Sequence, residues 1–357
     1  MRVLVVDDSA LYRKILSEAV SSVFGTQVAA VSSGELALKR LDSETFDLVL
    51  LDIFMNEMNG PEVLEKIRQS HPKVSVVMVS GATGRDADIT IGCLSNGAMD
   101  FIPKPSNSSF EAGLEVLKSD IRKAITMARL HGVTAISEAS KTPAQAVSFA
   151  PPLNQPPMKR LQPPPFLDLL LIGVSTGGPK ALADLVPLLS AKLPVPVLLV
   201  QHMPPFFTKS LAEQLDKSAG LSVKEAEDGH LPMPGEVLIA PGGFHLEVFR
   251  NDSGKLQTRL TSAPPVQSCR PSVDVLFNSA AKCKLRGAVA VILTGMGCDG
   301  ADGVATLKNS CPVWCIAQNQ ATSSVYGMPQ AAVLRHLDDE ILPLNEIAPR
   351  INKIFRV

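Results

Sequence analysis

The sequence contains 357 residues, of which 45 % are hydrophobic, and it carries 34 basic and 35 acidic side chains. This length and apolar content predict a globular protein with room for two cores and exclude a disordered chain. The balanced charge excludes a general attraction to nucleic acid or to an anionic membrane. No apolar run approaches the roughly eighteen residues of a membrane-spanning helix, and two aspartates follow the first apolar run. We therefore expect a cytoplasmic protein without membrane insertion.

The six cysteines are dispersed along the chain, and neither a Cys-x-x-Cys pair nor a zinc-type Cys/His spacing occurs among them. We expect reduced structural thiols. Cys298 adjoins a glycine-rich loop discussed below, but one neighbouring loop does not make a redox sensor.

Polar side chains follow the predicted buried strands of the first 130 residues. Residues 1–6 form an apolar run that ends in two aspartates, and Ser9 follows where it can cap a helix. Runs at residues 46–51 and 74–79 end in an aspartate and a serine, and residues 100–103 precede a Lys-Pro pair. Open parallel α/β sheets place their sites at the carboxyl ends of the strands. We therefore expect one site built from Asp7, Asp8, Asp52, Ser80 and Lys104.

The charges of this set indicate its chemistry. Clustered carboxylates repel one another unless a cation or a shared proton compensates them, and hard oxygen ligands favour Mg²⁺. A lysine and a hydroxyl nearby can hold the oxygens of a phosphoryl group transferred to one carboxylate. Any single aspartate here is better explained as a cap or a charge at a helix start, whereas the ordered set of five favours phosphoryl transfer.

Residues 1–130 resemble the receiver domain of two-component response regulators, which has a flavodoxin-like fold with a five-stranded parallel sheet. The resemblance implies that Asp52 accepts a phosphoryl group from a histidine kinase. It further implies that Asp7, Asp8 and Asp52, with the backbone carbonyl of Phe54, hold Mg²⁺.

The same resemblance assigns the switch residues. Ser80 and Lys104 would contact the phosphoryl group, Phe101 would be the switch aromatic, and Pro105 would follow a cis peptide bond. An ordinary core position is an open alternative for Phe101. A helix from Phe110 to about Arg129, with an apolar stripe, would close the receiver fold.

The chain departs from the receiver pattern at two positions beside the predicted metal site. Asn56 replaces the proline that is common after Met55, and Phe54 stands where many receivers carry a polar residue. Metal binding should survive, because position 54 contributes its backbone carbonyl. Loop stiffness and the lifetime of the phosphoryl group are less certain.

Residues 131–165 have the composition of a linker. Eight of the 28 prolines lie between Pro143 and Pro165, among alanine, serine and glutamine. Such a segment buries too little apolar surface to fold alone and favours extended conformations. A tether after a phosphorylatable domain indicates that residues 166–357 form the output domain.

The output domain opens with an apolar run at residues 169–172, which predicts a strand buried on both faces. A glycine-rich turn follows, and Pro179 fits the first position of a helix. Residues 173–177 match Gly-x-Ser-x-Gly, in which a sharp turn lifts a serine hydroxyl beside free backbone N–H groups. Ser175 is therefore a candidate nucleophile, and a loop that holds phosphate or packs helix on strand is the alternative.

Two later strands supply partners for this serine. The run at residues 196–200 ends before His202, whose imidazole could accept the serine proton. The run at residues 288–293 ends in a glycine-rich loop with Asp299, which could orient that imidazole. A second phosphate-binding loop is the competing interpretation. Weaker candidates are His230 and His245 for the base and Asp302 for the acid, while Asp274 fits a helix cap or brace.

The order Ser, His, Asp differs from that of the common Gly-x-Ser-x-Gly hydrolases, in which the acid precedes the histidine. The order resembles instead the catalytic domain of the chemotaxis methylesterases (the CheB family), an α/β doubly wound domain with a mainly parallel sheet. The matching segments are residues 201–205, 241–243, 271–274, 293–297, 317–320 and 326–329.

This resemblance implies hydrolysis of glutamate methyl esters on the helical cytoplasmic region of a chemoreceptor. Ser175 would attack the ester, His202 would act as base and Asp299 would orient it. Deamidation of glutamine would follow the same route. Backbone N–H groups near Met296 and His202 are candidates for the oxyanion site, and Thr176 for a supporting hydrogen bond. We expect no cofactor for the esterase, a monomer, and activation by phosphorylation of the receiver.

Three other functions are open. A DNA-binding output is disfavoured, because no basic recognition helix follows residue 165. A phosphorylation-dependent binding protein without esterase activity is disfavoured by the complete Ser, His and Asp set. A hydrolase for an unrelated ester or amide is the third alternative.

Overall fold

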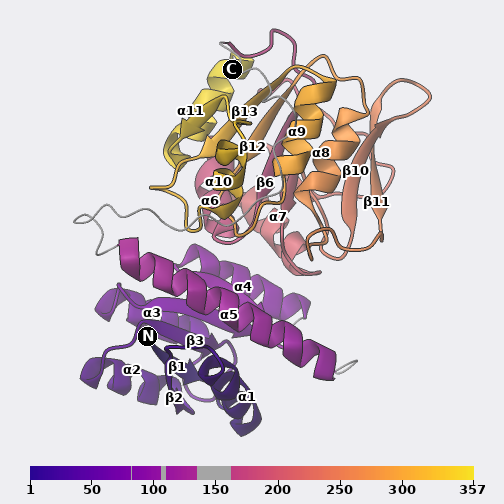
Figure 1. The fold of residues 1–357 in the computed structure, drawn as a ribbon. Coiled ribbons are helices and arrows are strands. Elements are labelled where there is room, and N and C mark those ends of the chain that lie inside the picture. Colours follow the sequence, from indigo (N-terminus) through magenta and orange to yellow (C-terminus); the bar gives the residue numbers. More distant parts are fainter. Residues whose placement is uncertain (82, 106–109, 135–161) are drawn as a thin grey trace. The chain divides into compact units, whose positions relative to one another are not determined.

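The computed structural model describes residues 1–81, 83–105, 110–134 and 162–357. The chain divides into two compact units, Met1–Ala146 and Val147–Val357, each built around its own sheet (Figure 1). Helix α5 continues to Thr134, which lies inside the segment predicted as a linker. Most of that segment, residues 135–161, lies outside the described residues, so the boundaries of the tether stay a prediction.

The N-terminal unit has five parallel strands in the order β2-β1-β3-β4-β5. Helices α1 and α5 pack together on one face, and α2, α3 and α4 follow one another on the other face. This confirms the predicted flavodoxin-like receiver fold. The elements are β1 (Arg2–Val6), α1 (Ala10–Ser21), β2 (Gln27–Val31), α2 (Gly34–Ser43), β3 (Leu48–Asp52), α3 (Gly60–Ser70), β4 (Ser75–Ser80), α4 (Gly84–Ser95), β5 (Asp100–Pro103) and α5 (Phe110–Thr134).

Local signals in the sequence set the ends of these helices. Ser9 caps α1 by accepting the N–H of Tyr12, as predicted. Helix α3 begins with a capping box between Asn59 and Glu62. A side chain at Gly60 would collide with the backbone of Asp52, so only glycine permits this close return of the chain to the end of β3.

Helix α5 closes the unit as predicted and runs further than residue 129. Leu117, Ile121 and Ala128 are buried, which confirms that part of the apolar stripe. The side chain of Phe110, the first residue of the predicted stripe, lies outside the described residues.

The C-terminal unit has a seven-stranded sheet in the order β14-β13-β12-β6-β7-β9-β8, and all its pairings are parallel. A separate antiparallel hairpin joins β10 to β11. The elements are β6 (Leu169–Val174), α6 (Gly178–Leu185), η1 (Val186–Leu188), β7 (Val197–Gln201), α7 (Phe207–Ser218), β8 (Ser222–Glu225), β9 (Glu236–Ile239), β10 (His245–Arg250), β11 (Leu256–Thr261), α8 (Val273–Ala281), β12 (Ala288–Ile292), α9 (Ala301–Ser310), β13 (Val313–Gln318), α10 (Gly327–Leu334), β14 (Glu340–Leu342) and α11 (Leu344–Phe355).

The strand order reverses direction at the centre of this sheet. From β6 the chain proceeds outward through β7, β8 and β9, and then returns to the other side of β6 for β12, β13 and β14. Helices α8, α9 and α10 cover one face, and α6, α7 and α11 cover the other. The crevice at the carboxyl ends of β6 and β12 is therefore a topological switch point, where such sheets bind ligands.

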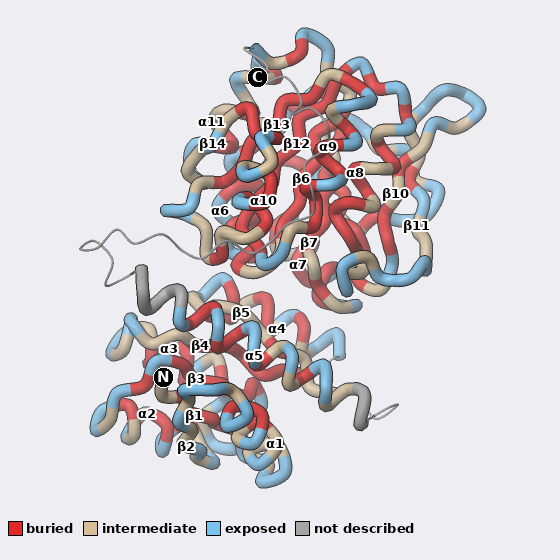
Figure 2. Tube along the Cα trace, in the orientation of Figure 1, coloured by how far each residue is buried: buried red, intermediate tan, exposed pale blue. Residues whose placement is uncertain are grey.

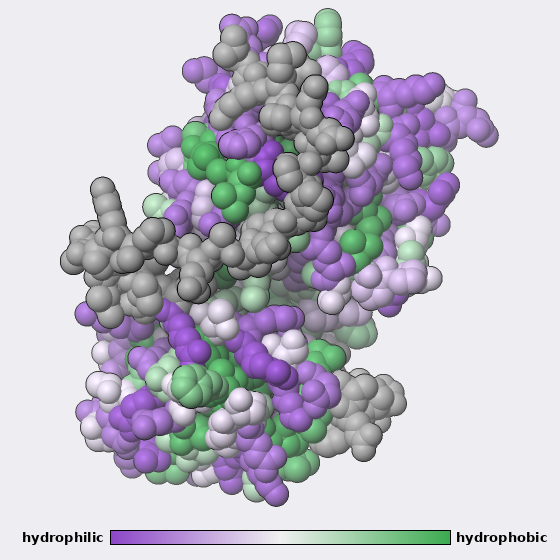
Figure 3. All heavy atoms as spheres, viewed as in Figure 1, coloured by the Kyte–Doolittle hydropathy of each residue, from purple (hydrophilic) through white to green (hydrophobic). Residues whose placement is uncertain are grey.

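The core of the C-terminal unit lies along the sheet and under α8 and α9, and buried residues follow the central strands in Figure 2. Strands β6, β7 and β12 are buried along their whole length, as expected for parallel strands with helices on both faces. On the face drawn in Figure 3, hydrophilic side chains are interspersed with hydrophobic areas in both units. Among the described residues, no helix is both long and apolar enough to cross a membrane.

Candidate active site

Ser175 directly follows β6 in a turn held by the loop after β12. Its backbone N–H donates to the carbonyl of Thr294 at 3.0 Å, and its carbonyl accepts the N–H of Gly178 at 2.8 Å. Gly177 adopts φ +73°, a conformation that favours glycine. A Cβ at Gly295 would lie 2.8 Å from the Cβ of Ser175. The two loops therefore pack backbone against backbone, and the serine lies at the switch point.

His202 reaches the same edge from the neighbouring strand, β7. Its backbone N–H donates to the carbonyl of Val174 at 3.1 Å, which continues the pairing of β6 with β7. The amide nitrogen of Gln201 donates to the carbonyls of Ser175 (2.9 Å) and His202 (3.1 Å). Gln201 thereby ties the serine loop to the histidine loop.

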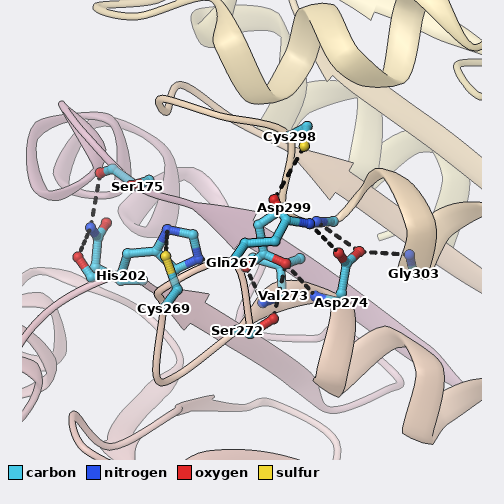
Figure 4. Close-up of polar contacts among 12 residues, drawn as sticks. Ser175, His202, Gln267, Cys269, Ser272, Val273, Asp274, Cys298, Asp299 and Gly303 are labelled. Carbon is cyan, nitrogen blue, oxygen red and sulfur yellow. Dashed lines mark hydrogen bonds and ion pairs between the residues drawn. The ribbon is translucent and has the colours of Figure 1, made fainter. Parts of the chain in front are cut away.

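The imidazole of His202 lies between a carboxylate and a thiol (Figure 4). Its Nε2 is 2.6 Å from Oδ2 of Asp299, and its Nδ1 is 3.5 Å from Sγ of Cys269. The structure therefore brings the predicted base and the predicted orienting acid together. Among the described residues, no hydrogen bond joins the hydroxyl of Ser175 to the imidazole.

The carboxylate of Asp299 is held by the first turn of α8. Oδ1 accepts the hydroxyl of Ser272 at 2.9 Å and the N–H of Asp274 at 2.9 Å, and Oδ2 accepts the N–H of Val273 at 2.7 Å. A helix N-terminus presents unpaired N–H groups and favours a negative charge. Asp299 is thus fixed by four donors when His202 is included.

Asp274 in turn caps helix α9, which follows Asp299 in the chain. Its Oδ1 accepts the N–H groups of Gly300 at 2.9 Å and Gly303 at 2.7 Å at the start of α9. Its Oδ2 accepts the amide of Gln267 at 2.9 Å. Asp299 therefore caps α8, which contains Asp274, and Asp274 caps α9, which follows Asp299. The predicted capping role of Asp274 agrees with this geometry.

The electrostatics of the group follow from these contacts. Burial alone would lower the pKa of His202, but hydrogen bonds to Asp299 and Cys269 more than offset it and raise the pKa to about 9. Burial would raise the pKa of Asp299, yet His202 and the α8 N–H groups hold it below its ordinary value. Burial, followed by the charge of Asp299, raises the pKa of Asp274 to about 7. The structure thus favours a charged carboxylate beside a protonated imidazole at neutral pH.

The weaker sequence candidates lie elsewhere. Asp302 is exposed and pairs with Arg335 at 2.7 Å. The imidazole of His230 pairs with Glu236 at 2.9 Å, and His245 is buried beneath the carbonyl of Pro264. None of these contacts involves the Ser175 edge.

The candidates for the oxyanion site differ in whether their N–H or hydroxyl group already has a hydrogen-bond partner. The N–H of Met296 has no acceptor within the part of the chain that the structure describes, and Thr176 has no recorded side-chain hydrogen bond there. The N–H of His202, which we also considered, is already bonded to Val174. This leaves Met296 and Thr176 as candidates.

Cys269 and Ser272 contact the His202–Asp299 pair, and sequence reasoning gave neither a role. They lie in the loop before α8, far from His202 in the chain. Ser272 belongs to a segment that matched the chemotaxis methylesterases, which could have indicated it. Cys269 offered only a dispersed cysteine as a signal, and it was expected to be structural.

The receiver edge forms a second site. Nζ of Lys104 lies 2.8 Å from Oδ1 of Asp52 and 3.0 Å from Oδ2 of Asp7, and both carboxylates are buried. Burial is the largest influence on Asp52 and raises its pKa to about 6, although Lys104 opposes it. Burial would lower the pKa of Lys104, but hydrogen bonds and charges of the two aspartates raise it. The lysine thus supplies part of the charge compensation.

The same edge offers oxygen ligands for a divalent cation. One carboxylate oxygen from each of Asp7, Asp8 and Asp52 lies within 4.8 Å of the others. Asp8 is exposed and accepts the amide of Asn56 at 3.1 Å, so one departure from the receiver pattern directly contacts a candidate ligand. Phe54 is exposed, with Arg85 5.7 Å above its ring. This donor set fits a hard cation such as Mg²⁺.

The switch candidates point to helix α4 and to β5. The hydroxyl of Ser80 donates to Gly81 at 3.0 Å and lies 2.8 Å from that of Thr90, so it faces α4. Phe101 is partly buried on β5.

The expected cis peptide before Pro105 is wrong. The cis bond among the described residues precedes Pro271 instead. The N–H of Lys104 continues the strand pairing by donating to Ser80 at 2.7 Å, and a trans bond is the lower-energy form for X-Pro.

Known proteins resemble the chain over both units. Residues 170–351 match the family model for CheB methylesterase, and residues 3–110 match the response regulator receiver domain. A protein-glutamate methylesterase/protein-glutamine glutaminase from Oceanobacillus iheyensis is 40 % identical over 355 residues, which cover 99 % of this chain and 98 % of that protein. The protein of the same name from Geobacillus kaustophilus is 41 % identical over 356 residues, covering 99 % of both chains.

A solved structure agrees with these relatives. The crystal structure of the Thermotoga maritima CheB methylesterase catalytic domain is 41 % identical, with a TM-score of 0.51, and the match covers 54 % of this chain and 99 % of that domain. The match confirms the doubly wound fold predicted for the output unit. Taken with the full-length relatives, it shows that the chain belongs to the CheB methylesterase family, as a member with an N-terminal response regulator receiver domain.

Proposed function

We propose that this chain hydrolyses the methyl esters of glutamate side chains in a chemoreceptor and deamidates glutamine side chains by the same route. The pairing of His202 with Asp299 at 2.6 Å carries this proposal, because it joins a base and its orienting acid from the two strands, β7 and β12, that flank the strand before the serine loop. The names of the full-length relatives describe the same two activities.

The contacts support one proton route. Nε2 of His202 is committed to Asp299, so Nδ1 is the nitrogen that receives the proton of Ser175. The hydroxyl oxygen of Ser175 then bonds to the ester carbon, and the proton passes from Nδ1 to the departing methoxide, which leaves as methanol. Water, deprotonated by the same nitrogen, then attacks the acyl carbon. The bond to the Ser175 oxygen breaks, that oxygen takes the proton back from Nδ1, and the glutamate carboxylate is released. Cys269 occupies Nδ1 in the structure, so Ser175 must replace it for the reaction.

The developing oxyanion needs donors near Ser175. The N–H of Met296 has no acceptor among the described residues, and Met296 follows Gly295, which packs against the serine. We assign Met296 to this role and Thr176 to a supporting one. Such donors act on charge that forms only in the transition state.

The geometry disfavours the alternatives for this edge. A phosphate-binding loop after β12 would place an anion beside the carboxylate of Asp299. The pKa of this carboxylate is lowered, so it is negatively charged and would repel the anion. A binding protein without esterase activity would have no use for an imidazole held by a buried carboxylate.

We also propose that phosphorylation of Asp52 by a histidine kinase raises the esterase activity. Asp7, Asp8 and Asp52, with the carbonyl of Phe54, would hold Mg²⁺, which would neutralise charge on the phosphoryl group when bound. Lys104 already contacts Asp52, and Ser80 and Phe101 would respond to the new charge. In this proposal the unphosphorylated receiver covers the Ser175 edge, and phosphorylation favours an open arrangement. The change requires the equilibrium between the two arrangements to shift by only a few kcal/mol.

The remaining assignments complete the proposal. The receiver comprises residues 1–130, the linker residues 131–165 and the catalytic domain residues 166–357. We infer a monomer that acts in the cytoplasm on the cytoplasmic region of the receptor and binds no nucleic acid.

The test is release of methanol from radiolabelled, methylated receptor membranes, with and without a small-molecule phosphodonor. We expect release that requires Ser175 and increases with the phosphodonor. The Ser175→Ala variant should release none. Absence of release from the phosphorylated wild type would contradict the proposed activity.

A further inference from the structure

Three large apolar side chains are exposed along the catalytic edge of the C-terminal unit. Met296 follows β12 and is 42 % exposed, Phe206 follows β7 and is 56 % exposed, and Phe244 follows β9 and is 45 % exposed. The strands lie in the order β12-β6-β7-β9, and Ser175 follows β6. The three side chains therefore flank the serine on both sides, across three strand spacings of ~4.8 Å each.

Phe206 has a strained backbone. Its φ of 73° and ψ of −38° lie in a region that bulky side chains rarely adopt and that glycine enters freely. Its ring is exposed, so burial of the ring in the core does not offset the strain. A residue that costs stability and contributes little packing is a candidate for a role in binding.

The surrounding loops fix this conformation. A side chain at Gly242 would collide with the backbone of Pro204, so the loop after β9 lies directly on the loop that contains Phe206. The N–H of Gly242 also donates to the hydroxyl of Thr208 at 2.9 Å. The carbonyl of Phe206 accepts the first N–H bond of α7 from Ser210 at 3.1 Å. The ring of Phe206 is thereby held outward at the edge, while the next residue, Phe207, enters the core.

We propose that Phe206, with Phe244 and Met296, forms the surface that binds apolar side chains next to the methylated glutamate of the protein substrate. This inference rests on the proposed function. A substrate whose reacting group is a side chain must place its neighbouring residues against the surface around Ser175. The reacting ester is uncharged, and the surface spans ~14 Å, slightly more than the ~10 Å diameter of a helix. Continuity with the catalytic edge identifies the polypeptide substrate as the occupant.

The test compares kcat and KM of the full-length Phe206→Gly variant for the methylated receptor and for a small glutamate methyl ester. We expect KM for the receptor to rise about tenfold, the effect of removing one central aromatic contact. The preference for receptor over small ester should fall by the same factor. The thermal midpoint should rise by a few °C, because glycine releases the strain.

Two further variants separate the ring from the strain. Phe206→Ala removes the ring but retains the unfavourable backbone, so KM should rise without a gain in thermal midpoint. Phe166→Gly is the matched control, because Phe166 is 62 % exposed and precedes β6 at the opposite edge of the sheet. It should leave both KM values unchanged.

The outcomes are distinct. An unchanged receptor KM in Phe206→Gly, or equal losses on receptor and small ester, overturns the docking surface while the esterase stands. Faster hydrolysis of the small ester by the unphosphorylated variant, together with an unchanged receptor KM, would show that Phe206 contacts the receiver and not the substrate, and this would also overturn the proposal. A wild type inactive on both esters removes the proposed function and this inference together.

Discussion

The two units place buried aspartates at the carboxyl edges of parallel sheets, but the two carboxylates have opposite surroundings. Asp52 accepts one backbone N–H, from Ile53 at 2.8 Å, and pairs with Lys104. Burial raises its pKa to about 6. Asp299 accepts two N–H groups, a hydroxyl and the imidazole of His202, and its pKa is lowered despite burial.

The difference shows how the same kind of sheet edge can favour two chemistries. Asp299 is surrounded by fixed donors, so its charge is stable and can orient a base. Asp52 depends on a single lysine for most of its compensation, and it lies beside the buried Asp7. An additional cation would compensate such a carboxylate further, which fits the proposed transfer of a phosphoryl group to Asp52. The donors around each aspartate differ more than the sheet edges do, and they favour the different role proposed for each.

The largest expected effect comes from removing the charge of Asp299. Asp299→Asn keeps the size of the side chain but directs an amide at donors that need an acceptor. We expect kcat/KM for methyl ester hydrolysis to fall about a thousandfold or more, as for other oriented serine–histidine pairs. Methanol release from methylated receptor measures the loss.

Asp302→Asn is the matched control for that variant. Asp302 lies three residues further along the chain and pairs with Arg335 on the surface. Its replacement should change kcat/KM less than twofold, within the range of an exposed ion pair. A comparable loss in both variants would indicate a general effect of charge on α9 and would contradict the orienting role of Asp299.

The next largest effect is the pH dependence of methyl ester hydrolysis at the catalytic edge. The base must be neutral to accept a proton, and the pKa of His202 is raised to about 9. We therefore expect kcat/KM of the phosphorylated chain to rise about tenfold per pH unit toward pH 9 and then to level. Cys269→Ala removes one contact that raises this pKa, so its rising limb should move to lower pH. A wild-type limb centred near pH 6.5 would contradict the strength of the Asp299 contact.

The same shift affects stability with the opposite sign. The folded pKa of His202 lies above its ordinary 6.5, so its ion pair contributes fully below pH 6.5 and is lost as the pH rises through about 9. The thermal midpoint of the wild type should fall over this window, and that of His202→Gln should fall less. Parallel midpoint curves for the two proteins would contradict the linkage.

The response to phosphorylation depends on the other aspartate. Asp52→Asn removes the acceptor, so the variant should incorporate no phosphate from a small-molecule phosphodonor and should show no stimulated methanol release. The expected stimulation in the wild type is about ten- to a hundredfold, for a shift of ~1.4–2.8 kcal/mol. Asp42→Asn, at an exposed residue that pairs with His71, should keep the response. Stimulation that persists in Asp52→Asn would place phosphorylation elsewhere.

Much of this arrangement could be predicted from the sequence, because runs of apolar residues mark buried parallel strands and their ends mark the sheet edges. That reasoning located Asp7, Asp52, Ser175, His202 and Asp299. It works best where a functional side chain lies at or just after the end of a strand, as for Asp52, Ser175 and His202, since pairing of the strands then fixes its position. Asp299 lies farther on, in the loop after β12.

The contacts that hold Asp299 could not be predicted in the same way. Ser272 and Cys269 lie in a loop before α8, and their approach depends on how α8 and α9 pack side by side. The reciprocal capping by Asp274 needs two helix N-termini to meet, which no local pattern specifies. The prediction of a cis peptide bond before Pro105 was wrong, and it rested on the family pattern alone. The metal ligands and the catalytic roles stay predictions.

The smallest predicted effect tests how many donors Asp299 needs. Ser272→Ala removes the hydroxyl that donates to Oδ1 at 2.9 Å but leaves the N–H groups of α8 and His202. A hydrogen bond to a charged group contributes about 1.5–3 kcal/mol. Because three donors remain, we expect kcat/KM to fall only about three- to tenfold, with no change in the response to phosphodonor.

Ser279→Ala separates this effect from the stability of α8. Ser279 lies on the same helix, donates to the carbonyl of Leu276 at 2.7 Å and accepts the N–H of Val248 at 2.9 Å. Loss of the Ser279 hydroxyl should lower the thermal midpoint about as much as loss of the Ser272 hydroxyl does. It should leave kcat/KM unchanged, because Ser279 does not contact Asp299. If both variants lose activity equally, α8 acts only as a scaffold. If only Ser272→Ala does, the orientation of Asp299 depends on each donor, unlike that of Asp52 at the receiver edge.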